Sequence, residues 1–152
     1  MTSEPYLRKA IPEDIDILFQ WANDETTRQN AFNPHKINHE EHKKWFNEKL
    51  NSDKTVIYVY CIDKTPIGQI RIDITDNIGL ISYSIDSTHR KQGHGKKIIE
   101  LLEQTLINEL PNINKLIAKV KKTNIASQHI FVRLNYSCFK NVDYFVYEKV
   151  LK

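Results

Sequence analysis

The sequence predicts a mixed α/β fold, with a central sheet of six to seven strands flanked by about four helices. Segments rich in β-branched and aromatic residues alternate along the chain with segments of helical periodicity. Three strand-like segments in the middle follow one another with only short turns between them. The 152 residues suffice for a single domain, residues 1–152. We expect the element order β-α-α-β-β-β-α-β-α-β.

The N-terminal third is expected to hold one strand and two helices. Residues 6–9 form the strand, and Pro12 begins the first helix because proline fits a first helical turn. Asn38 caps the second helix, with Glu41 three residues later as its capping-box partner. Apolar residues then recur at helical spacing as far as Leu50.

The middle of the chain is expected to form an antiparallel meander of three strands. The strands cover residues 55–62, 67–74 and 78–86, and polar turn residues separate them. In the second strand isoleucines occupy every other position and polar residues lie between them. Since side chains alternate across a strand, one face is apolar and the other polar.

The C-terminal third is expected to add two helices and two strands. An amphipathic helix ends before Pro111, and residues 115–121 form the next strand. Asn124 caps a helix that runs through Leu134, and residues 143–150 form the last strand.

Composition disfavours several classes of protein. A net charge of +3 is mild for a nucleic-acid binder. No apolar run reaches the length of a membrane span, and the N-terminus lacks signal-peptide features, so we expect a cytoplasmic protein. Cys61 and Cys138 lack metal-site spacing and are expected to be buried thiols in strands. We expect no metal, nucleic-acid or membrane partner.

A basic loop with two glycines, residues 88–97, precedes the third helix. Gly93 and Gly95 permit a tight turn and a close approach of the backbone to a ligand. Helix N-termini bind phosphate, and Lys96 and Lys97 in the first turn favour a bound anion over a merely solvated loop. The loop lacks the spacing of a nucleotide-hydrolysing P-loop and of the dinucleotide-binding fingerprint.

The motif Arg90-x-x-Gly93-x-Gly95 resembles the Gln/Arg-x-x-Gly-x-Gly/Ala signature of the GNAT N-acetyltransferases. Residues 82–86 look like that family's fourth strand, and residues 124–136 resemble its Asn…Ser…Leu-Gly-Phe region. The resemblance implies a GNAT fold and acetyl-CoA as co-substrate. It also implies direct transfer of the acetyl group to a primary amine, without an acyl-enzyme.

The resemblance also implies where acetyl-CoA binds. The loop amides hold the pyrophosphate, and the pantetheine arm pairs with the end of the preceding strand. A backbone N–H near Ile85 polarises the thioester carbonyl. The cofactor-binding residues implied in this way are Ile85, Asp86, Arg90, Lys91, Gln92, Gly93, His94, Gly95, Lys96, Asn124 and Ser127.

The sequence identifies the general acid and base of the reaction less clearly than the acetyl-CoA site. The family often has a tyrosine general acid at the position of Phe131, which cannot donate a proton, and Tyr136 matches a packing phenylalanine. Leu80 lies where many relatives have a glutamate base. We expect a water-relayed base, with Asp73 or Ser82 orienting the water. The catalytic candidates are Asp73, Ser82, Ser84 and Tyr136.

Residues 21–46, together with 67–71, are similar to GNAT enzymes that acetylate the 4-amino group of nucleotide-linked sugars on the route to pseudaminic-acid-like sugars. Arg28 and Arg71 are suited to pair with phosphate or carboxylate. His42 has a suitable pKa range for a base, although a histidine on an apolar helix face is more often structural. The substrate-binding candidates are Asn23, Arg28, Phe32, His42, Gln69 and Arg71.

Three functions remain open at this stage. The first is acetylation of an amino sugar or another small-molecule amine. The second is acetylation of a peptide or protein N-terminus, because relatives of that kind share a similar start. The third is binding of acyl-CoA without turnover. The protein is expected to be a monomer or a homodimer.

Overall fold

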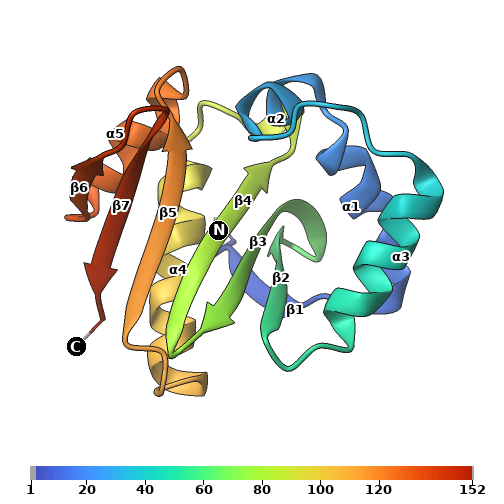
Figure 1. The fold of residues 1–152 in the computed structure, drawn as a ribbon. Helices are drawn as coiled ribbons and strands as arrows, with labels where there is room; N and C mark the ends of the chain where they lie inside the picture. The colour runs from blue at the N-terminus through green and yellow to red at the C-terminus, as the bar shows by residue number, and fades with distance from the viewer. Residues whose placement is uncertain (1–2, 152) are drawn as a thin grey trace.

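The computed structural model describes residues 3–151, which form a seven-stranded sheet with helices on both faces (Figure 1). The strands are β1 (Tyr6–Lys9), β2 (Thr55–Ile62), β3 (Thr65–Thr75), β4 (Ile78–Ile85), β5 (Lys115–Lys121), β6 (Ser137–Lys140) and β7 (Tyr144–Val150). The helices are α1 (Ile15–Ala22), α2 (Glu25–Asn30), α3 (His39–Leu50), α4 (His94–Glu109) and α5 (Ile125–Arg133), with short 3-10 helices at Pro12–Asp14 and Ser87–His89.

The sheet has the strand order β1-β2-β3-β4-β5-β7-β6 and divides between β4 and β5. Neighbouring strands are antiparallel except for β4 and β5, which are parallel. That parallel pair joins only residues 78–80 to residues 115–117. The C-terminal half of β4 therefore runs on without β5 beside it, and its outer edge is available to another extended chain.

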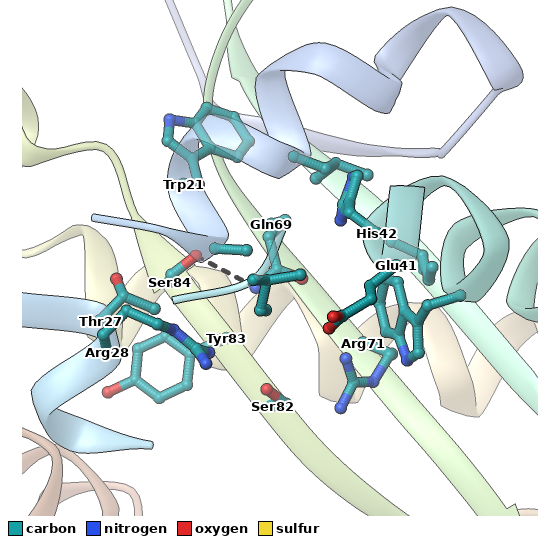
Figure 2. Close-up of a pocket in the computed structure, with 15 residues that line it drawn as sticks. Trp21, Thr27, Arg28, Glu41, His42, Gln69, Arg71, Ser82, Tyr83 and Ser84 are labelled. Atoms are coloured by element: carbon teal, nitrogen blue, oxygen red, sulfur yellow. Dashed lines mark hydrogen bonds between the residues drawn. The ribbon is translucent and has the colours of Figure 1, made fainter. Parts of the chain in front are cut away.

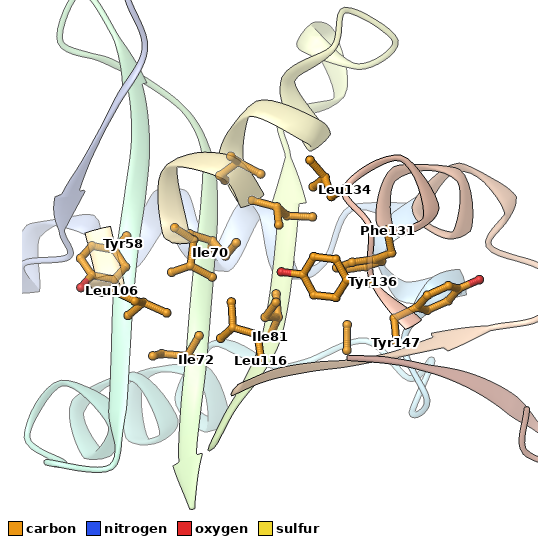
Figure 3. Packing of buried hydrophobic residues seen from close by; sticks show 14 of the residues in the cluster. Tyr58, Ile70, Ile72, Ile81, Leu106, Leu116, Phe131, Leu134, Tyr136 and Tyr147 are labelled. Atoms are coloured by element: carbon orange, nitrogen blue, oxygen red, sulfur yellow. The ribbon is translucent and has the colours of Figure 1, made fainter. Parts of the chain in front are cut away.

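The larger core packs α4 and α5 against one face of the sheet. Ile70 and Ile72 of β3 are fully buried with Leu102 and Leu106 of α4 (Figure 3). Under α5, the Phe131 ring stacks on the Tyr147 ring of β7 with centroids 5.4 Å apart. Burial of apolar side chains on this scale is the main force that holds the two wings of the sheet together.

The smaller core packs α1 and α3 against the other face. Leu18 and Trp21 of α1 and Phe46 of α3 are buried together with Ile57 and Val59 of β2. The polar face of β3 points to this same side. The helices here cover β2 more closely than β3 and β4, since α3 makes its sheet contacts mainly with β2. This arrangement leaves room above β3 and β4 for a cavity.

The structure confirms the predicted fold class and every predicted element, and adds α2 and β6. The six residues of α2 are Glu-Thr-Thr-Arg-Gln-Asn, which have no apolar periodicity, and an Asp24 cap starts the helix. All four residues of β6 are exposed at the sheet edge, so they lack the alternation that marks a strand. Cys138 on β6 is exposed, which corrects the expectation that both thiols are buried. No helix within residues 3–151 is long and apolar enough to cross a membrane.

Candidate active site

The loop before α4 turns through left-handed backbone. Lys91 has φ +62° and Gly93, the N-cap of α4, has φ +85°. A β-carbon at Gly93 would meet no atom within 4 Å, so the backbone angle, rather than crowding, favours glycine here. The first amides of α4 lack helical partners, and its first turn has no acidic residue while Lys96 lies in it. These features suit the α4 N-terminus to an anionic ligand.

Gly95 has a different role from Gly93. A β-carbon built on Gly95 would lie 2.6 Å from Cδ1 of Ile130 on α5. Any larger residue would therefore require the end of the Ile130 side chain to move. The second glycine of the motif allows this helix contact.

Arg90 and His94 fasten the loop to the rest of the fold. The Arg90 guanidinium donates through Nη2 to the Asp24 carboxylate and through Nε to the carbonyl oxygen of Ile85, the latter over 3.2 Å. Burial opposes ionisation of Asp24, but hydrogen bonds from Arg90 and Thr27 outweigh it and lower the pKa of Asp24. The Nδ1 atom of His94 lies 2.8 Å from the hydroxyl of the buried Tyr60. These two side chains hold the loop against the rest of the fold. Within the loop, the Gln92 side chain donates a hydrogen bond to the Thr88 carbonyl.

Asp86 joins the same loop to α1. Its carboxylate accepts hydrogen bonds from the Thr88 amide (3.1 Å) and from the Trp21 indole Nε1 (2.9 Å). Bonds from Thr88 and Trp21 lower the pKa of Asp86 to about 2. Asp86 therefore remains ionised and couples the loop to the helix that carries Trp21.

Asn124 and Ser127 organise the start of α5. The Asn124 side chain accepts from the Ser127 amide as an N-cap, over 3.3 Å. The Ser127 hydroxyl lies 2.6 Å from the hydroxyl of Tyr83 on β4. This contact bridges β4 and α5 on the side where β4 has parted from β5.

A cavity of about 450 Å³ lies above β3 and β4 and is bordered by α1, α2 and α3 (Figure 2). A volume of this size fits a small molecule. Its lining residues are Leu18, Trp21, Ala22, Thr27, Arg28, Ile37, Glu41, His42, Trp45, Ile57, Gln69, Arg71, Ser82, Tyr83 and Ser84.

The charges in the cavity are mostly positive. Arg28 donates through Nη1 to the carbonyls of Asn33 (3.0 Å) and His35 (3.2 Å), while its Nε is buried without a partner. Burial lowers the pKa of the Arg28 guanidinium, and no carboxylate in residues 3–151 forms an ion pair with it. Arg71 lies over the Trp45 ring at 5.0 Å from its centroid. Glu41 supplies a carboxylate, which points toward Arg71 (Figure 2).

Residues 6–137 match the family model of the acetyltransferase (GNAT) domain. The chain belongs to the GNAT acetyltransferase family. It is therefore an acetyltransferase, and its seven-stranded sheet with helices on both faces is the GNAT fold.

Solved structures share this GNAT fold at low identity. The spermidine N-acetyltransferase of Vibrio cholerae, in complex with CoA and spermine, has a TM-score of 0.87 and 13% identity over 97% of this chain and 95% of that one. RimL, a ribosomal L7/L12 alpha-N-protein acetyltransferase in complex with CoA, gives 0.83 and 18% over 99% and 95%. The aminoglycoside acetyltransferase AAC(6')-Ib, in complex with CoA and kanamycin, gives 0.81 and 14% over 97% and 95%. Comparison with curated proteins gives no significant match.

Asp73, a predicted base, is not among the residues that line the cavity above β3 and β4. Its carboxylate accepts from Lys49 (3.1 Å), Thr55 (2.8 Å) and Arg71 (3.1 Å). Burial opposes ionisation, but Arg71, Thr55 and Lys49 together outweigh it and lower the pKa of Asp73. A carboxylate with these three partners orients Arg71 and has little capacity left to take a proton from an amine.

His42 reaches the cavity, but its ring is part of the core. It is 2% exposed, and its Nε2 lies 3.0 Å from the carbonyl oxygen of Ile15 on α1. The ring stacks on Phe46 with centroids 5.9 Å apart. Burial lowers the pKa of His42, so the ring is neutral at neutral pH and holds α3 against α1.

Three other predicted residues lie outside the cavity lining. Tyr136 packs beneath α4 (Figure 3), where its hydroxyl donates to Glu103 over 2.8 Å, and burial raises its pKa above the usual range. Phe32 is 53% exposed and contacts the ring of Tyr144. Asn23 holds the segment between α2 and α3 through two hydrogen bonds to the backbone of Ile37.

The remaining predicted acceptor residues do meet in the cavity. Gln69 and Arg71 on β3 lie opposite Ser84 and Ser82 on β4, and Gln69 Nε2 donates to Ser84 Oγ over 3.1 Å. Sequence reasoning did not propose Glu41 as a site residue, because its capping-box role with Asn38 explained its presence. The Glu41 Oε1 atom accepts from Asn38 Nδ2 over 2.7 Å, and the same side chain is part of the cavity lining.

Proposed function

We propose that the protein is an acetyl-CoA-dependent N-acetyltransferase whose acceptor is a small primary amine with an anionic group, such as a nucleotide-linked amino sugar. The observation that carries the acceptor class is Arg28. Its guanidinium lies in the lining of the cavity, has no carboxylate partner within residues 3–151, and carries one buried N–H without a hydrogen bond. A phosphate or carboxylate of the acceptor supplies the counter-charge that this guanidinium lacks.

The acetyl-CoA site is proposed from the loop and from the edge of β4. The amides of residues 91–96 receive the pyrophosphate at the positive end of α4. The Asp86 N–H donates to the Ile67 carbonyl on β3. Because backbone groups alternate sides along a strand, those of Tyr83 and Ile85 face the side that β5 has left. The pantetheine arm pairs there, and the solved relatives that contain CoA support this assignment.

Catalysis is proposed as direct attack within this cavity. The amine nitrogen attacks the thioester carbonyl carbon, and a β4 amide near Ile85 stabilises the developing oxyanion. The Glu41 carboxylate, which points into the cavity, accepts the amine proton (Figure 2). Ser82 and Ser84 line the floor, where their hydroxyls orient the acceptor or a bridging water.

The electrostatics of the cavity disfavour polycationic acceptors. The charged groups in its lining are Arg28, Arg71 and Glu41, with His42 neutral. A polyamine or aminoglycoside would bring several positive charges against Arg28, the guanidinium of the lining that has no ion-pair partner within residues 3–151, whereas Arg71 is paired with Asp73. A cavity volume of about 450 Å³ matches a small-molecule acceptor.

The test is release of CoA thiol with mass-spectrometric detection of the acetylated product. The acceptors are a nucleotide-linked 4-amino sugar, the same amino sugar without its nucleotide, a short peptide with a free N-terminus, and spermidine. We expect the highest kcat/KM with the nucleotide-linked sugar. A preference for the peptide or spermidine would overturn the acceptor class, and binding of acetyl-CoA without any turnover would overturn the enzymatic role.

A further inference from the structure

We propose that Tyr83 donates the proton that the CoA thiolate needs as it leaves, and that Ser127 stabilises the resulting tyrosinate. This proposal rests on the acetyl transfer proposed above. It assigns the general acid to a residue of β4, beside the point where β4 and β5 separate. The nearby side chain of α5, Phe131, cannot donate a proton.

The chemistry requires such a donor. Attack of the amine forms a C–N bond, and collapse of the tetrahedral intermediate breaks the C–S bond with its electron pair going to sulfur. The Tyr83 O–H proton passes to this sulfur, and the Ser127 hydroxyl donates a hydrogen bond to the phenolate oxygen. The amine proton goes to Glu41, and the tyrosinate regains a proton from solvent after CoA leaves.

The position of Tyr83 fits this role. It belongs to the part of β4 that has no β5 beside it, and it is among the residues that line the cavity (Figure 2). A β-carbon at Gly95 of the loop would lie 3.7 Å from its Cε2. The Tyr83 ring therefore lies between the acceptor cavity and the start of α4, where acetyl-CoA must pass if the loop holds its pyrophosphate.

The hydroxyl of Tyr83 is held by α5. It lies 2.6 Å from Ser127 Oγ, and either hydroxyl can donate in this bond. The Phe131 ring lies edge-on to the Tyr83 ring, with centroids 6.3 Å apart. Tyr83 thus brings a phenol to the same α5 face that presents Phe131.

The protonation state of Tyr83 is compatible with a donor. Burial raises the pKa of its phenol, so it holds its proton at neutral pH, and the hydrogen bond with Ser127 opposes that rise. The same bond stabilises the charged form that follows proton transfer.

Other buried phenols do not reach the cavity. Tyr60 bonds to His94, Tyr136 bonds to Glu103, and Tyr147 stacks beneath α5. Among residues 3–151, Tyr83 is the tyrosine in the cavity lining. The rival explanation is structural: the bond between Tyr83 and Ser127 merely ties β4 to α5.

The test compares leaving groups in wild type and Tyr83→Phe. One donor is acetyl-CoA; the other is the acetyl thioester of 4-nitrothiophenol, whose acidic thiol leaves without needing a proton. We expect Tyr83→Phe to lower kcat/KM for acetyl-CoA by about 100-fold, the scale of general-acid catalysis, and to leave the nitrothiophenyl reaction nearly unchanged. Equal losses with both donors, or no loss with acetyl-CoA, would overturn the proposal in favour of the structural explanation.

Two further variants complete the design. Tyr147→Phe removes a hydroxyl from the same core cluster but outside the cavity, and should leave both reactions unchanged. Ser127→Ala should show the same selective loss with acetyl-CoA at a smaller scale, about 10-fold. This variant provides a second test if Tyr83→Phe folds poorly. Wild type that releases no CoA with any amine would contradict the proposed function itself, an outcome distinct from equal rates in wild type and Tyr83→Phe.

Discussion

The loop that precedes α4 and the cavity above β3 and β4 are built in opposite ways. The loop, residues 88–97, is one continuous segment whose glycines, cations and helix start are all local features. The cavity takes its lining from six helices and strands and the segments between them. A continuous segment can be recognised from the sequence, because its residues are neighbours in the chain. The residues of the cavity come together only when the chain folds.

The two regions are nevertheless joined by named contacts. Asp86 bonds to Trp21 in the cavity wall, and Arg90 bonds to Asp24 at the start of α2. The arginine of the motif therefore serves to fix the helix that carries Arg28. These contacts make the loop before α4 and the cavity lining one structural unit.

The largest expected effect comes from Glu41, the carboxylate that faces the cavity. Glu41→Gln should lower kcat by about 100-fold or more at saturating acceptor, since it removes the proposed proton acceptor but retains most of the side chain's shape. The measurement is steady-state release of CoA thiol across pH.

Glu40→Gln is the matched control for that experiment. It removes the same charge from the same first turn of α3, but from a side chain outside the cavity lining. If both variants lost activity equally, the effect would lie in the helix and its dipole, and the assignment of Glu41 as base would fail.

Arg28 gives a narrower test of the acceptor class. Arg28→Gln should raise KM for a nucleotide-linked amino sugar about 10- to 100-fold, as expected for loss of a charge-assisted hydrogen bond. The KM of acetyl-CoA and that of the amino sugar without its nucleotide should change little. A uniform rise for both acceptors would show that Arg28 only supports the segment with Asn33 and His35.

The smallest expected effect concerns Asp86, which connects the loop to the cavity lining through its bond to Trp21. The folded-state pKa of Asp86 is about 2, below its usual 3.8, so its stabilising bonds are present above pH 4 and are lost as pH falls toward 2. Asp86→Asn should lower the free energy of unfolding by about 2 kcal/mol at pH 7, and this gap should shrink between pH 4 and pH 2.

Urea unfolding at pH 7, 4 and 2.5 measures that gap. Asp16→Asn is the control, because the Asp16 side chain is 87% exposed and should contribute no comparable gap. A difference between wild type and Asp86→Asn that stayed constant with pH would mean that the carboxylate charge does not hold the loop to α1.

The sequence was sufficient for the fold and for the position of the glycine-containing loop before α4, because periodicity and glycine position are local properties. It could not identify which side chains meet across the sheet. The sequence favours Asp73 as a base, but in the fold its carboxylate is occupied by Lys49, Thr55 and Arg71. Glu41 already had a capping role, and the bond between Tyr83 and Ser127 spans 44 residues of sequence. These contacts depend on tertiary packing, which no local pattern encodes.

The most direct test of the central claim is calorimetric titration of wild type and Gly93→Glu with acetyl-CoA and with acetyl-pantetheine, which lacks the pyrophosphate. The new carboxylate would occupy the open space over the α4 N-terminus. We expect Gly93→Glu to weaken acetyl-CoA binding at least about 100-fold, to leave the weaker acetyl-pantetheine binding unchanged, and to preserve the circular dichroism spectrum. Wild-type affinity of Gly93→Glu for acetyl-CoA, or equal loss for both ligands, would contradict a pyrophosphate site at this loop.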